Sequence, residues 1–165
     1  MNLNEAIDAC LKIEQKKIDN LCKLVNESTE IIILGNGGSS AIASHISQDY
    51  TKKLKKKSFT FSDSSRLTCY INDYGMENAY KQFLKEFCNK NTLVILISSS
   101  GNSVNITNCA EFCVQENINF IVLTGFGKDN KLRKFSNKAR EEFWIDSKDY
   151  GVVECIHQII LHTPA

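Results

Sequence analysis

Apolar runs and segments of helical periodicity alternate along the whole chain. Residues 30–34, 92–97 and 118–123 form continuous runs rich in Ile, Leu and Val, as expected of strands that are buried on both faces. Shorter runs at 58–61 and 142–145 predict two more strands. Apolar residues at helical spacing predict an N-terminal helix at about 3–27. The same spacing predicts further helices at about 40–55, 64–72 and 76–88, one that ends near 116, one at 129–137, and a last helix from about 152. Alternating strands and helices predict an α/β fold in which a parallel sheet carries helices on both faces.

Length and charge limit the class of protein. The 165 residues fit a single domain spanning 1–165, and 42% hydrophobic with 24% charged residues is typical of a globular chain. The net charge of +1 favours neither nucleic acid nor an anionic membrane as a partner. The first residues resemble no signal peptide, and no apolar run approaches the length of a bilayer span. We therefore expect a cytoplasmic protein with no nucleic-acid or membrane partner.

Lysine and cysteine are the two residue types with an unusual distribution. Lysines at 52, 53, 55, 56 and 57 form one basic run, which is either a solvated helix end or an attractor for an anionic substrate. The seven cysteines include no CxxC pair, so no zinc ribbon or dithiol redox motif is available. We interpret them as reduced, small core residues of a cytosolic protein.

Two glycine- and serine-rich loops follow predicted strands and precede predicted helices. The first reads GNGGSS (35–40) and the second SSSGNS (98–103). In an open α/β sheet, ligands bind outside the carboxyl ends of the strands, where helix N-termini present free N–H groups to phosphates. Ordinary turns with N-cap serines are the alternative interpretation. Neither loop contains GxxxxGK[ST] or GxGxxG, so no nucleotide cofactor is expected.

All three histidines fall on two predicted helices. His45 and Asp49 are four residues apart on the helix after the first loop, and the last helix carries Glu154, His157 and His162. Imidazole and carboxylate groups at this spacing suit zinc, although such pairs are also common as structural contacts. The histidines are therefore candidate metal ligands or acid–base groups.

The ordered set of GNGGS, NDYG (72–75) and SSSGNS resembles the sugar isomerase (SIS) family, and within it the sedoheptulose-7-phosphate or phosphoheptose isomerases. The resemblance covers residues from about 30 to 162. It implies the SIS fold, a flavodoxin-like three-layer α/β/α sandwich, and a homotetramer with sites at subunit interfaces.

The resemblance also implies roles for individual residues. Asp49 and His162 would be catalytic, and one zinc ion per subunit would be held by His45, Asp49, Glu154 and His162. The substrate-binding residues would come from both loops, the NDYG motif and the last helix: Asn36, Gly37, Gly38, Ser39, Asn72, Asp73, Ser98, Ser99, Ser100, Ser103 and Glu154.

Three positions depart from the pattern of the family it resembles. Asp49 stands where that family has glutamate, Glu154 where it has glutamine, and Gly151 where it has an acidic residue. Aspartate is one methylene shorter, and misplacement on that scale can cost about 100-fold in rate. In addition, residues 154 and 162 lie about 12 Å apart along an ideal helix, so they do not easily share one metal within a chain.

The implied activity is an isomerisation of sedoheptulose 7-phosphate to glycero-manno-heptose 7-phosphate through an enediol, for bacterial lipopolysaccharide or capsule biosynthesis. The departures at Asp49 and Glu154 leave an alternative open: a non-catalytic SIS module that binds a sugar phosphate or a protein, of replication-initiator-binding or regulatory type. An isomerase for another sugar phosphate, or a transferase-associated SIS domain, is a third possibility.

Overall fold

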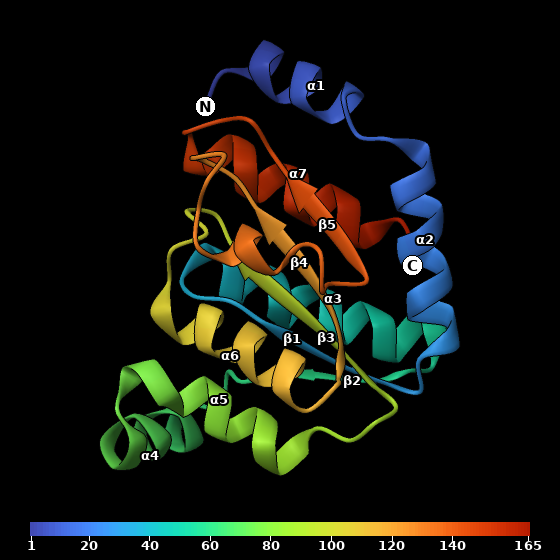
Figure 1. Cartoon of the computed structure of the whole chain (residues 1–165). Helices are drawn as coiled ribbons and strands as arrows, with labels where there is room; N and C mark the ends of the chain where they lie inside the picture. Colours follow the sequence, from blue (N-terminus) through green and yellow to red (C-terminus); the bar gives the residue numbers. More distant parts are fainter.

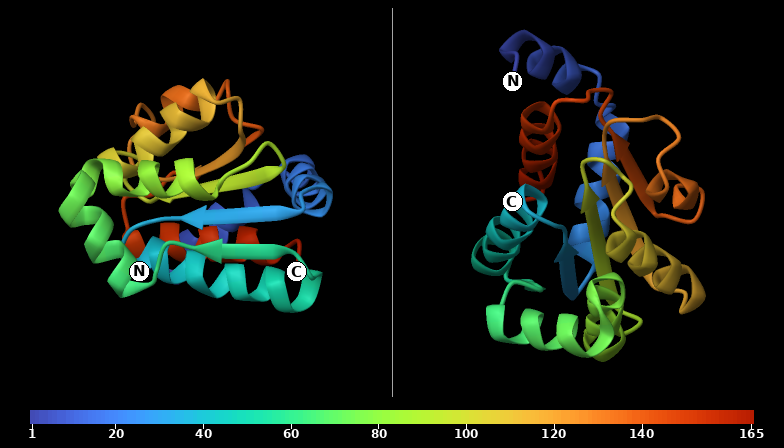
Figure 2. Two further views of the ribbon diagram at one scale, coloured as in Figure 1. Left: turned by 90° about the horizontal axis from the view of Figure 1, so that it is seen from below. Right: turned by 90° about the vertical axis from the view of Figure 1, so that its left-hand side faces the viewer.

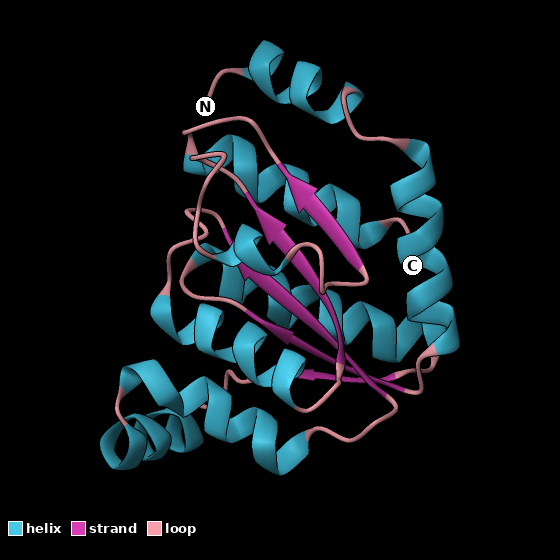
Figure 3. Ribbon diagram, viewed as in Figure 1, coloured by secondary structure: helices cyan, strands magenta, loops and turns pink.

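Five parallel strands form one sheet in the order β2-β1-β3-β4-β5 in the computed structural model, which describes residues 1–165 (Figures 1 and 3). The strands are β1 (Glu30–Leu34), β2 (Lys57–Thr60), β3 (Thr92–Ser98), β4 (Asn119–Thr124) and β5 (Glu141–Trp144). This arrangement confirms the predicted α/β fold. The strand order is flavodoxin-like and reverses between β1 and β3, which is where such sheets bind ligands.

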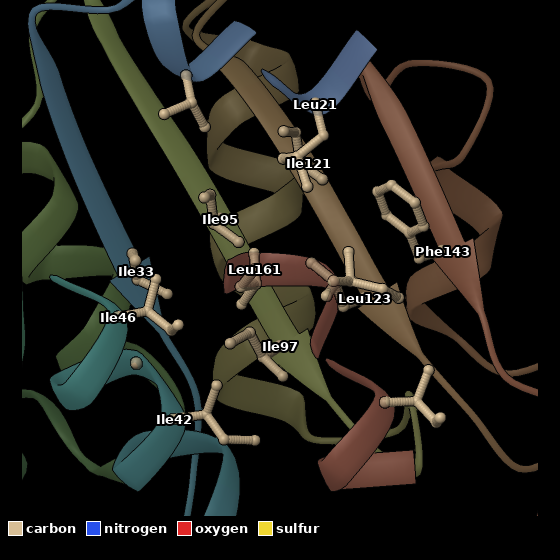
Figure 4. Packing of buried hydrophobic residues seen from close by; sticks show 14 of the residues in the cluster. Leu21, Ile33, Ile42, Ile46, Ile95, Ile97, Ile121, Leu123, Phe143 and Leu161 are labelled. Atoms are coloured by element: carbon tan, nitrogen blue, oxygen red, sulfur yellow. The ribbon is translucent and has the colours of Figure 1, made fainter. Parts of the chain in front are cut away.

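Helices cover both faces of the sheet (Figure 2). They are α1 (Leu3–Leu11), α2 (Gln15–Glu27), α3 (Gly38–Leu54), α4 (Ser64–Tyr74), α5 (Met76–Phe87), α6 (Val104–Gln115), the 3₁₀ helix η1 (Leu132–Phe135) and α7 (Tyr150–His162). One face packs against α2, α3 and α7, and the other against α5 and α6. Figure 4 shows the first of these cores, where alternate side chains such as Ile95 and Ile97 of β3 meet Ile42 and Leu161.

The N-terminal segment is two helices rather than the single helix predicted over 3–27. α1 and α2 are separated at residues 12–14, where Glu14 has an extended backbone. The break lets α1 change direction and pack along α7, whereas a continuous helix would extend away from the sheet (Figure 1). α1 buries none of its own residues completely, while α2 contributes Leu21 and Leu24 to the core. Apolar spacing alone did not reveal this break.

The predicted helix at 129–137 is also shorter than expected. Only η1 (Leu132–Phe135) is helical there, because the preceding Asn130 is buried and uses its side chain to hold the loop. Its amide donates to the carbonyls of Gly125 and Gly127, and its carbonyl accepts from the Arg133 N–H.

The cysteine interpretation holds only in part. All seven cysteines are free, and Cys109 and Cys113 are buried on α6. Cys69 and Cys155 are exposed, so they are not core residues. The basic run lies at the C-terminal end of α3, where Lys52 and Lys53 occupy the last turn and complement the helix dipole.

The outer edge of β5 is covered by side chains of α2. The Lys17 ammonium donates to the Glu142 carbonyl at 2.9 Å, and the Asn20 amide donates to the Arg140 carbonyl at 3.1 Å. Both acceptors are backbone groups that a sixth strand would otherwise use. None of the helices combines the length and apolar character needed to cross a bilayer.

His157, in the middle of α7, is fully buried, and burial lowers its pKa to about 4. An unfolded chain takes up this proton below its ordinary pKa of about 6.5, whereas the folded chain resists protonation until about 4. Stability should therefore fall as the pH drops through this window, by about 3 kcal/mol in total. Urea unfolding at about pH 7.5 and 4.5 measures this loss, and His157→Gln should show a shallower pH dependence than the wild type. An identical slope in both proteins would assign acid sensitivity to other groups.

Candidate active site

A pocket of 220 Å³ lies at the carboxyl ends of β1 and β3, at the reversal of strand order. It is lined by residues of both glycine- and serine-rich loops together with two residues of α7: Asn36, Gly37, Gly38, Ser39, Ile97, Ser98, Ser99, Ser100, Ser103, Tyr150 and Glu154. The two loops that the sequence singled out therefore form one site. With the exception of the NDYG pair, the structure brings the expected substrate-binding residues together.

Paired side-chain bonds join the first loop to the first turn of α6, which follows the second loop directly. The amides of Asn36 and Asn105 exchange two hydrogen bonds of 2.9 and 2.8 Å. Within the second loop, the Ser98 hydroxyl donates to the Ser103 hydroxyl at 3.2 Å, and the Gly101 N–H donates to the Ser98 carbonyl at 2.9 Å. Gly101 has a φ of +66°, a backbone conformation that favours glycine. Contacts within the chain therefore fix the conformation of both loops.

Two helices begin at this pocket without a side-chain cap. α3 starts after Gly37, which has no side chain to act as a cap, and α6 starts after Ser103, whose hydroxyl does not bond to the first turn. Uncapped first-turn amides and the positive end of the helix dipole favour an anion. The Ser99 hydroxyl is buried without a partner in the chain, and it is one more donor at the same place. The pocket is suited to a phosphate group.

α7 supplies the wall opposite the loops. Tyr150 lies in its first turn with its ring edge-on to Phe126 at a centroid distance of 4.7 Å. Glu154 follows one turn later, and its carboxylate lies so close to Gly38 that a Cβ there would be 2.4 Å from an oxygen. Only glycine fits at position 38 with Glu154 in this conformation.

A second cluster forms farther along α3 and α7. The nearest His45 and His162 nitrogens lie 3.9 and 3.5 Å from Asp49 Oδ2, and the two imidazole rings are 5.2 Å apart. Their ligand atoms all lie within 4.8 Å of one another. The i, i+4 spacing places His45 and Asp49 on one face of α3, and α7 brings His162 beside them. The three side chains therefore form one cluster.

Lys53, one turn beyond Asp49, modifies this cluster. Its ammonium donates to Asp49 Oδ2 at 3.0 Å, and this bond, supported by the charges of Lys53 and of the imidazoles when protonated, holds the pKa of the Asp49 carboxyl below its usual value. Asp49 is itself almost buried on the inner side of α3. The carboxylate is therefore ionised and has a resident cationic neighbour.

The cluster fits a metal ion in its donor chemistry. Two imidazole nitrogens and one carboxylate oxygen are a common set of ligands for zinc when a fourth position is left open. Glu154 is not among these groups, since it lies eight residues before His162 on the same helix, about 12 Å away along its axis. The set of four ligands that the resemblance implied is therefore a set of three within one chain.

The NDYG residues lie outside both clusters. Asn72 and Asp73 are exposed near the end of α4, where Asp73 accepts hydrogen bonds from Asn72 and from the Cys69 thiol. α4 contacts α5 and buries no residue of its own, and neither Asn72 nor Asp73 lines the pocket in this chain.

Sequence reasoning missed three residues at these sites. Lys53 was assigned to a basic run, although its i, i+4 relation to Asp49 predicts the ion pair. Tyr150 is one helical turn before Glu154, and the same spacing argument would have placed it at the pocket. Asn105, the partner of Asn36, has no local signal, because the two residues are 69 positions apart.

Solved structures with the same fold include phosphoheptose isomerases from Neisseria gonorrhoeae and Francisella tularensis. The first has a TM-score of 0.86 at 22% identity, covering 98% of this chain and 92% of its own. The second has a TM-score of 0.83 at 20% identity, covering 96% and 88%. No family model matches the chain. These similarities show that the chain has the fold of the sugar isomerase (SIS) class.

Relatives of known sequence narrow this class. A phosphoheptose isomerase of Fusobacterium nucleatum is 31% identical over 157 residues, covering 92% of this chain and 78% of the relative. The phosphoheptose isomerase of Buchnera aphidicola is 30% identical over 162 residues, covering 90% and 82%. The chain belongs to the phosphoheptose isomerase family.

Proposed function

We propose that this protein converts sedoheptulose 7-phosphate to glycero-manno-heptose 7-phosphate, as a cytoplasmic enzyme that supplies heptose for lipopolysaccharide or capsule. The observation that carries the proposal is the serine-lined pocket at the start of two uncapped helices, in a chain of the phosphoheptose isomerase family. The phosphate would bind the amides and hydroxyls of the loop from Ser98 to Ser103.

The chemistry assigned to the second cluster is proton transfer. The Asp49 carboxylate takes the proton from the carbon next to the substrate carbonyl, so that the C–H bond breaks and an enediol forms. His162 moves a proton between the two neighbouring oxygens, and the Asp49 carboxylic acid returns its proton to the former carbonyl carbon. No atom is lost or gained, and the carbonyl has moved by one carbon.

Zinc is the metal we assign to this enzyme. His45, Asp49 and His162 would hold it, and when bound it would supply Lewis-acid stabilisation for the negative charge that develops on the carbonyl oxygen. Lys53 competes for the same Asp49 oxygen, so we expect the ion to bind more weakly than in a site without this lysine.

We also assign a homotetramer to this protein, and the separation of the two clusters supports sites between its subunits. Ser39 and Asp49 are ten residues apart on α3, or about 15 Å, so a pocket and a proton-transfer cluster from different subunits would meet more easily than those of one chain. The outer face of α1 offers an apolar surface for assembly, where Leu3, Ile7 and Leu11 are 67%, 49% and 78% exposed at helical spacing.

The direct test is to incubate the purified protein with sedoheptulose 7-phosphate, with and without added zinc, and to follow formation of the aldose. Conversion that depends on Asp49 supports the proposal. No conversion with zinc supplied rejects it.

A second candidate function is a non-catalytic module that binds a sugar phosphate or a protein. The Lys53–Asp49 ion pair favours it, because a carboxylate neutralised by lysine is a weaker base. A chain that binds phosphate ligands, holds no zinc and converts no sugar would have this function instead.

Glu154 gives a prediction about phosphate affinity. Its carboxylate faces the pocket beside Gly38, where it repels a phosphate dianion. Glu154→Gln removes the charge and keeps the size, so inorganic phosphate should bind about tenfold more tightly, as measured by calorimetry. Glu154→Asp keeps the charge and serves as the control. Equal affinity in the wild type and Glu154→Gln would mean that the phosphate binds away from this side chain.

A further inference from the structure

α7 carries residues of both clusters, and two buried side-chain hydrogen bonds fix its position. His157 contacts the end of β4, and Tyr50 of α3 contacts the end of α7. Both side chains are completely buried, and each bonds to a backbone carbonyl. Neither residue lines the pocket or belongs to the metal-binding cluster.

The first of these bonds lies next to the phosphate pocket. His157 Nε2 is 3.1 Å from the Thr124 carbonyl oxygen, which also accepts the Ile145 N–H at 2.9 Å. A carbonyl acceptor requires the proton on Nε2, which leaves Nδ1 buried without a partner in the chain. Thr124 pairs with Ser98 across the sheet, so His157 is anchored to the end of β4, beside the end of β3 from which the serine loop begins.

Because Glu154 and His157 lie on the same helix, the bond that fixes His157 also fixes the position of Glu154 at the pocket. Glu154 lies three residues before His157 and therefore on the adjoining face of the same helix. Val153 packs against Gly125, whose N–H donates to the Ser99 carbonyl at 2.9 Å. A rotation or shift of α7 would therefore displace both the Glu154 wall and the contact with the serine loop.

The second bond lies next to the metal-binding cluster. The Tyr50 hydroxyl donates to the Leu161 carbonyl at 2.8 Å. Tyr50 directly follows Asp49, and Leu161 directly precedes His162, so this one bond joins the two neighbours of the Asp49–His162 contact.

We propose that His157 and Tyr50 are positioning residues, and that each acts on a different half of the site: His157 holds the phosphate pocket in its binding geometry, and Tyr50 holds His162 against Asp49. The proposal rests on the function proposed above for these two clusters. Loss of one hydrogen bond should therefore impair phosphate binding alone, and loss of the other should impair metal binding alone. A merely structural role of either residue would impair both kinds of binding together.

The test measures binding of two probes, inorganic phosphate by calorimetry and Co²⁺ by its visible absorption, in variants of the full chain. Gln and Met have similar lengths, but only Gln has an N–H that reaches the Thr124 carbonyl. We expect His157→Met to weaken phosphate binding about tenfold and His157→Gln to stay within about threefold of the wild type, with cobalt binding unchanged in both. Tyr50→Phe should weaken cobalt binding about tenfold and leave phosphate binding unchanged.

Loss of both affinities in both His157→Met and Tyr50→Phe would overturn the proposal, because general loosening of α7 would explain it. Unchanged affinities in both variants would overturn it as well. If His157→Met does not fold, the other two variants test the proposal. Loss of phosphate affinity in His157→Gln contradicts the proposal, and so does wild-type cobalt affinity in Tyr50→Phe. Neither probe requires turnover, so a negative isomerase assay with these affinity patterns intact would reject only the proposed reaction.

Discussion

Asp49→Asn should lower kcat for sedoheptulose 7-phosphate about a thousandfold and leave KM nearly unchanged. The amide keeps the shape of the side chain and its place beside His162, but it cannot take a proton from carbon. The phosphate pocket lies elsewhere on the chain and contains no part of Asp49, so substrate binding should persist. Steady-state kinetics with added zinc measure both constants.

Asp49→Glu is the matched control for this change. It retains a carboxylate on the same face of α3 and lengthens the side chain by one methylene, so measurable turnover should remain. Asp49→Asn with wild-type kcat would show that another group removes the proton, and Glu154 would then be the carboxylate to test next, because it is the acidic residue that lines the pocket.

Gly101→Ala should abolish phosphate binding and lower the free energy of unfolding by about 3 kcal/mol. The φ of +66° is unfavourable for alanine, and its Cβ would lie 2.1 Å from the Asn130 carboxamide. Asn130 could move only by giving up its hydrogen bonds to the carbonyls of Gly125 and Gly127. The same loop is bonded to Gly101 itself, through the Leu132 N–H and the Gly101 carbonyl at 2.9 Å.

Gly127→Ala provides the comparison for Gly101→Ala. A Cβ at Gly127 meets no atom within 4 Å, so this variant should retain near-normal stability and phosphate affinity. Urea unfolding and phosphate calorimetry on both variants test the pair. Retention of phosphate binding in Gly101→Ala would mean that the conformation of the second loop is less important than its hydroxyls.

The strands and the first site were predictable because their signals are local. Runs such as 92–97 are apolar on both faces, as is typical of central strands, and each serine-rich loop follows such a run directly. Parallel topology then brings the two loops to the same end of the sheet. The i, i+4 relation of His45 and Asp49 was equally readable.

The remaining features depend on which helix packs where. The crossing of α3 and α7 decides which residues of α7 lie beside Asp49. It brings His162 there and keeps Glu154 away, and no local sequence pattern encodes this crossing. The break between α1 and α2 has a similar origin, since it results from packing against α7 rather than from a proline or glycine. The partner of Asn36 likewise comes from a distant helix.

The hydrogen bonds from Lys17 and Asn20 to the backbone of β5 and of the residue before it have a consequence for how molecules of this protein can join. A border strand whose carbonyls are already occupied cannot seed the lateral addition of another chain, so fibre-like growth is disfavoured at that side. On the β5 side of the sheet, contacts between copies are therefore left to the helical exterior, where finite, closed complexes are the usual result.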